Sequence, residues 1–284
     1  MSTGSKRAGD DGGERRKEDA RNDGSLDPER TRDRLESMRG ALRTERRRLV
    51  DERQAFGAFR KRLSEIDPGQ PPTGRSAGSR VVGTAPARSV SPGLVAVRDA
   101  YEETVMSVPH YAEDYDDTYP ESLEAEFGAG MAAALTRGSA LDPSLKRELS
   151  GAAGRLRENR DAFVGTLDTE ASSLSARSDR LLELDAELQG IANAEFGDMD
   201  FGALDAHRAR IEALRDRCEE DVRERQETIH EQRRELRVPG DSPDVPRYLY
   251  REQPARHPIL SMLADRIDRL DALRSTVETA MARR

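Results

Sequence analysis

The chain has 284 residues, of which 36% are charged and 4% aromatic, and its formal net charge is −8. Because about a quarter of the residues are charged in a typical domain, this composition argues against a thick globular core and favours helices that meet along narrow apolar stripes. The one Cys excludes a disulfide framework within the chain, and the apolar runs are too short to span a membrane, so we expect a soluble, cytoplasmic protein.

Only four of the 47 basic residues are Lys, and carboxylates outnumber basic residues. An acid excess with scarce Lys favours adaptation to a high-salt cytoplasm, because carboxylates support solubility better than ammonium groups do. A GC-rich genome would also replace Lys by Arg, so this alternative stays open.

The chain divides by composition into four segments. Residues 1–26 have almost no apolar side chains, and we expect a disordered tail. Residues 27–66 follow the start signal Asp27-Pro28 and form a basic heptad helix. Residues 67–90 are rich in Pro, Gly and Ser and are expected to be a flexible linker, and residues 91–284 are expected to form the main helical domain.

The apolar residues of the first helix recur at the seven-residue spacing of a coiled-coil seam. This expected interaction seam consists of Leu35, Met38, Leu42, Leu49, Phe56, Phe59, Leu63 and Ile66. Glu45 and Glu52 interrupt it at core-type positions. These carboxylates weaken a self-paired zipper, so we expect a mobile arm that docks within the chain or on a second copy.

The remaining helices follow from their start signals and apolar spacing. A helix begins at Ser91-Pro92, and another opens at Pro120 and continues to Gly138. Between them, we interpret the rings of Tyr111, Tyr115 and Tyr119 as covers for helix junctions.

Residues 142–192 and 202–236 are expected to form a long antiparallel hairpin, which turns at 193–200. Cys218 lies on its apolar stripe and is expected to be a buried thiol, whereas charges dominate beyond Val222 and predict a solvated region. A final helix follows Pro258. The predicted fold class is therefore all-α, an elongated antiparallel helical hairpin or coiled coil with short helices packed at its base.

The long helix also carries charges at core-type positions, namely Arg160, Glu170 and Arg177. An unpaired buried charge is expensive. These residues, like Glu45 and Glu52, must either face solvent at a widened seam or pair across it, and pairing would fix the register of the helices.

The sequence contains no recognisable catalytic constellation. It has no phosphate-binding loop, and its four His residues are widely separated. The acidic run Glu113, Asp114, Asp116 and Asp117 lacks the spacing and the glycine of a calcium-binding loop, so we interpret it as a solvated loop. We therefore expect no metal, no cofactor and no enzymatic activity.

Charge is distributed unevenly along the chain. Residues 28–66 hold twelve Arg and Lys against seven Asp and Glu, whereas residues 91–137 hold two against ten. Arg43, Arg46, Arg47 and Arg48 form a possible basic patch for nucleic-acid phosphates. Attraction between the basic helix and the acidic segment is the simpler explanation.

Three segments resemble a family of halophilic-archaeal helical proteins of unknown function. They are VRDAYEETVMSVPHY at 97–111, AEFGAGMAAAL at 125–135 and RYLYREQPARHPILSMLADRIDRL at 247–270. The resemblance implies no chemistry. We expect a non-enzymatic scaffold or regulatory protein that acts through coiled-coil contacts, with a protein partner or by self-association and without a membrane; the alternative is a nucleic-acid-associated regulator that uses the basic first helix.

Overall fold

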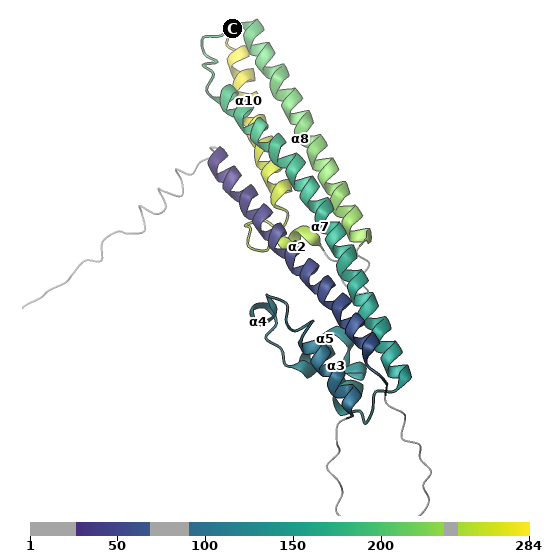
Figure 1. Ribbon diagram of the computed structural model, residues 1–284. Coiled ribbons are helices and arrows are strands. Elements are labelled where there is room, and N and C mark those ends of the chain that lie inside the picture. The colour runs from purple at the N-terminus through teal and green to yellow at the C-terminus, as the bar shows by residue number, and fades with distance from the viewer. Residues whose placement is uncertain (1–26, 69–90, 236–243) are drawn as a thin grey trace, which may run out of the picture. The chain divides into compact units, whose positions relative to one another are not determined.

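The computed structural model describes residues 27–68, 91–235 and 244–284, and every regular element within them is a helix (Figure 1). The elements are α2 (Pro28–Glu65), α3 (Pro92–Glu102), α4 (Tyr111–Asp114), α5 (Tyr119–Phe127), α6 (Ala129–Arg137), α7 (Pro143–Ala192), α8 (Phe201–Glu235), α9 (Val245–Leu249) and α10 (Pro258–Met281). The all-α class is therefore confirmed for the described residues. The expected disordered tail and most of the expected linker lie outside them.

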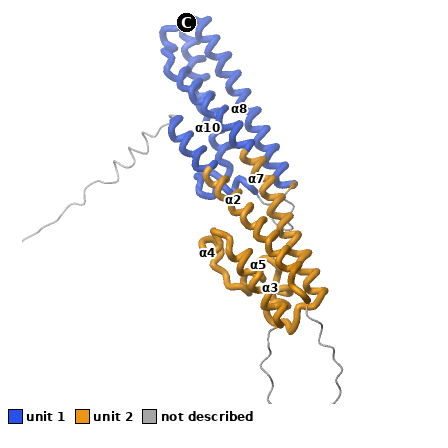
Figure 2. Tube along the Cα trace, viewed as in Figure 1, with its two compact units in different colours: residues 1–39, 172–234, 243–284 blue, residues 40–171, 235–242 orange. Residues whose placement is uncertain are grey.

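The chain divides into two compact units, shown in different colours in Figure 2. Of the described residues, unit 1 contains 27–39, 172–234 and 244–284, and unit 2 contains 40–68, 91–171 and 235. Helices α2 and α7 each contribute residues to both units. The first helix is thus part of two packed bodies.

The core of unit 2 is built around aromatic side chains. Phe59 of α2 packs edge to face against Tyr101 of α3, with ring centroids 5.3 Å apart, and Phe56 meets Phe127 of α5 at 6.4 Å. Such pairs add to the free energy gained by burying the rings. Tyr119 is buried in the same core, as its assignment to a helix junction predicted, whereas Tyr115 is 45% exposed.

The part of α2 in unit 2 is docked within the chain, which is one of the two placements expected for the first helix. Phe56, Phe59 and Leu63 are fully buried in the core of that unit. The ammonium group of Lys146 on α7 also donates to the backbone oxygens of Ser64 and Ile66, at 3.0 and 2.5 Å. These bonds satisfy carbonyls at the end of α2, which would otherwise lack partners.

The helix expected from Pro120 to Gly138 is divided into α5 and α6. Gly128 between them has a φ of +81°, a left-handed conformation that side chains with a Cβ adopt only at a cost. At the other end of α5, Thr118 and Glu121 form a capping box that satisfies the first backbone amides. The apolar spacing alone did not reveal the break.

Unit 1 contains the turn between α7 and α8 and an aliphatic core. Glu187 of α7 pairs with Arg210 of α8. Arg180, which comes earlier on α7, pairs with Glu224, which comes later on α8. This order indicates that the two helices run in opposite directions within the unit. Cys218 is buried in the core with side chains from α10, as expected.

Candidate functional site

The residues of the expected interaction seam are used inside the chain. Seven of them are buried and the last is partly buried: Leu35, Met38, Leu42, Leu49, Phe56, Phe59, Leu63 and Ile66. A partner therefore has no access to this stripe in the structure, and a surface for binding must be sought elsewhere.

The possible basic patch is partly neutralised by carboxylates of its own unit. Arg46 Nε lies 2.6 Å from Asp168 Oδ1, and Arg48 Nη2 lies 2.9 Å from Asp114 Oδ1. The second pair joins the basic helix to the acidic segment, which is the internal attraction that the charge distribution predicted. Arg43 and Arg47 are exposed.

Unit 2 contains a partly buried cluster of charges centred on Arg160. Its Nε donates to Glu52 Oε2 at 3.1 Å and its Nη2 to Glu126 Oε1 at 2.6 Å, while the guanidinium lies 5.1 Å from the ring centre of Phe56. Glu52 and Arg160 are both seam charges of the sequence, so the pairing alternative is correct for these two residues.

Burial and neighbouring charge shift the protonation of this cluster. Burial raises the pKa of Glu126, and the Arg160 guanidinium offsets part of that rise. The two carboxylates in turn raise the pKa of Arg160 against the opposing effect of its burial. The groups thus hold one another in place, which is the chemistry of a structural network.

Two residues from the segment before α5 complete the cluster. The Tyr115 hydroxyl donates to Glu52 Oε1 at 2.9 Å, and His110 Nε2 lies 3.2 Å from the same oxygen. Burial and the Glu52 carboxylate raise the pKa of Tyr115, so its hydroxyl remains a donor. Sequence spacing could not have assigned these contacts, because 58 and 63 residues separate the partners.

Several arginines are buried in unit 1, and Arg266 is one of them. Arg266 of α10 is 2% exposed, and its Nη2 donates to Asp185 Oδ2 at 2.7 Å and to Thr31 Oγ1 at 2.9 Å. Its Nη1 donates to the carbonyl oxygen of Met262 at 2.7 Å. This pair was not predicted from the sequence, although Asp185 directly follows the apolar position of Leu184.

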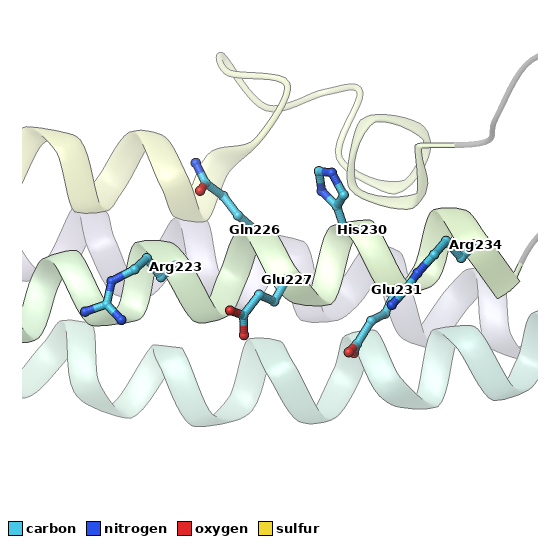
Figure 3. Close-up of a pocket in the computed structure, with 6 residues that line it drawn as sticks. All are labelled: Arg223, Gln226, Glu227, His230, Glu231 and Arg234. Carbon is cyan, nitrogen blue, oxygen red and sulfur yellow. The ribbon is translucent and has the colours of Figure 1, made fainter.

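One face of α8 is exposed over three turns. We define the α8 outer face as the residues that line a surface hollow there: Arg223, Gln226, Glu227, His230, Glu231 and Arg234 (Figure 3). Their spacing of three and four residues places them on one side of the helix. All six are exposed, as the charge density beyond Val222 predicted.

The charges of the α8 outer face have both signs. Figure 3 shows Glu227 and Glu231 on one edge of the helix and His230 on the other. Arg223 lies 2.5 Å from Glu220 one turn away. The surface thus offers carboxylates, guanidinium groups and an imidazole to a partner.

The described residues contain no group of three or more His, Cys, Asp or Glu side chains arranged to hold a metal ion. Among the described helices, none is long and apolar enough to cross a membrane.

Comparison with known proteins assigns the chain to a family. A family model described as "Domain of unknown function (DUF7260)" matches residues 33–274, and the chain belongs to this family. No curated protein and no solved structure matches the chain.

Proposed function

We propose that the protein, a member of this family of unknown function, is a non-enzymatic scaffold or regulatory protein. It binds a helix of a partner protein on the α8 outer face. The observation that carries the proposal is the contrast between two helix surfaces. The apolar seam of α2 is buried by the chain itself, whereas the α8 outer face is exposed and lines a hollow.

A helix is the partner that suits this surface best. Side chains at Arg223, Glu227, Glu231 and Arg234 recur every three or four residues, which is the spacing at which a second helix presents its own side chains. A partner helix with basic residues opposite Glu227 and Glu231 and an acidic residue opposite Arg234 would form complementary pairs. Such pairs contribute more to the choice of partner than to affinity.

The finer features expected from the sequence belong to the same proposal. We infer that α7 and α8 pack as an elongated coiled-coil hairpin with the short helices at its base, and that the protein works in the high-salt cytoplasm of a halophilic archaeon. The scarcity of Lys and the acid excess support this setting.

The alternative of a nucleic-acid-associated regulator receives less support. Carboxylates pair with Arg46 and Arg48, two of the four arginines it requires. Self-association remains an outcome of the experiment below.

Affinity purification from a native high-salt lysate tests the proposal. The tagged full chain is compared with a variant in which Arg223, Glu227, Glu231 and Arg234 are replaced by Ala. We expect at least one protein to be recovered with the full chain. The recovered amount of that protein should be at least tenfold lower with the variant.

The matched control replaces Arg251, Glu252, Arg256 and Asp268 by Ala. These residues are exposed in the same unit and carry the same two positive and two negative charges, so the net charge of the two variants is equal. The control should recover the partner at the level of the unmodified chain. Equal recovery by all three proteins would contradict the proposal.

A further inference from the structure

Residues 110–117, which we name the acidic strap, lie across α2 and are fastened to it by polar contacts. Arg48 pairs with Asp114 at 2.9 Å, and the Tyr115 hydroxyl donates to Glu52 at 2.9 Å. The ring of His110 lies against the same carboxylate. Charge and hydrogen bonding therefore supply the attachment.

The strap buries one residue, His110, which is 8% exposed, whereas Asp114 and Tyr115 are exposed. Its helix, α4, has four residues, none of them buried. Asp116 has a φ of +48°, in the left-handed region that a residue with a Cβ enters only at a cost. The segment therefore has the features of a region of low local stability.

The helix that follows is anchored differently. Tyr119 and Leu123 of α5 are buried in the unit 2 core, and the Thr118 capping box fixes the helix start. The boundary between weak and strong attachment thus falls between Asp117 and Thr118.

We propose that the acidic strap detaches from α2 as a local unit while α5 stays packed, and that its release uncovers Arg48 and Glu52. In the closed state, Asp114 forms an ion pair with the Arg48 guanidinium, and His110 and Tyr115 contact Glu52. In the open state, Arg48 joins the exposed Arg47 as a charge available at the surface. The strap is thus a built-in cover that controls access to a charged patch, and it does not depend on the function proposed for α8.

Hydrogen exchange of the full chain tests this proposal at three amides. The backbone amides of Asp114, Tyr115 and Asp116 donate to carbonyl oxygens within the strap at 3.0, 2.9 and 3.1 Å. Asp114→Asn weakens the pair with Arg48, and Tyr115→Phe removes the hydrogen bond to Glu52. In each variant we expect these amides to exchange roughly 1.5- to fivefold faster, the range that the loss of one exposed polar contact allows.

Two controls separate detachment from other causes. Glu113→Gln removes a strap carboxylate that is exposed, and it should leave the three amides unchanged. The amides of Ser122 and Gly128, which donate to carbonyls at the two ends of α5, should keep their protection in every variant. Acceleration in α5 by the same factor as in the strap would overturn the proposal, as would unchanged exchange in both contact variants or equal acceleration in Glu113→Gln.

Discussion

Unit 1 buries the ion-paired Arg266 almost completely and unit 2 buries the ion-paired Arg160 only in part, and the two units neutralise these charges differently. In unit 1, Arg266 has Asp185 as its ion-pair partner, and the two side chains are 2% and 0% exposed. In unit 2, Arg160 is 18% exposed and shares its charge with Glu52 and Glu126. When an ion pair is fully removed from water, losing one charge leaves the other buried without its counterion. In a partly solvated network, water can replace the lost member. The comparison predicts different costs for removing one charge in each unit.

The largest expected effect is in unit 1. Asp185→Leu leaves the Arg266 guanidinium buried without its carboxylate and should lower the free energy of unfolding by about 3–5 kcal/mol. Urea unfolding measures this loss. The double variant Asp185→Leu/Arg266→Met removes both charges and should recover most of the stability; a double variant as unstable as the single one would contradict the explanation.

Cys218 reports on the same unit. Burial raises the pKa of its thiol to about 11, from an ordinary value of 9.0. At pH 8 the native thiolate population should therefore be about a hundredfold lower than in the unfolded chain, and labelling by a thiol reagent should slow accordingly. Because the pKa is raised, the contribution of this thiol to stability is present below pH 9 and lost as the pH rises through 11. Labelling of the native protein at the rate of the urea-unfolded chain would show that unit 1 opens readily.

A smaller effect is expected in unit 2. Arg160→Met should cost about 1–2 kcal/mol at pH 7, because Glu52 and Glu126 remain together but stay within reach of water. Burial raises the pKa of Glu126, so its contribution to stability is present at low pH and lost as the pH rises through that pKa. The difference in the free energy of unfolding between Arg160→Met and the unmodified protein should therefore be smaller at pH 5 than at pH 7. Urea unfolding at the two pH values measures it.

Arg157→Met is the control for that experiment. Arg157 is exposed on the same helix and should change stability by less than about 0.5 kcal/mol at either pH. An Arg160→Met cost as large as that of Asp185→Leu would remove the distinction between the two units.

The smallest effect concerns a single helix end in unit 2. Thr118→Ala removes the capping box of α5 and should cost about 1 kcal/mol of stability. Thermal unfolding followed by circular dichroism measures the loss. An unchanged midpoint would show that core packing alone fixes this helix start.

Local sequence patterns predicted the long helices well. The segments 142–192 and 202–236 were expected as helices, and α7 and α8 cover Pro143–Ala192 and Phe201–Glu235. Apolar periodicity and proline start signals determine such elements because both act over a few residues. The break at Gly128 was missed, since glycine is tolerated within a helix and its φ depends on packing.

The contacts of charged residues were predictable only in part. Glu52 and Arg160 were recognisable because a charge interrupts an apolar period, and pairing followed from the cost of burying either one alone. Their further partners, Glu126, His110 and Tyr115, lie on segments whose approach depends on tertiary packing. The α8 outer face was expected to be solvated, but the hollow that it lines required the structure.

Cross-linking of carboxylates to a co-purified partner tests the central claim most directly. A reagent that joins carboxylates to amines should connect Glu227 and Glu231 to the partner protein, and these cross-linked peptides can be identified by mass spectrometry. We predict cross-links at these two residues and none at Glu252 or Asp268, which are exposed in the same unit. Partner cross-links at Glu252 and Asp268, with none at Glu227 or Glu231, would contradict the assignment of the α8 outer face as the binding surface.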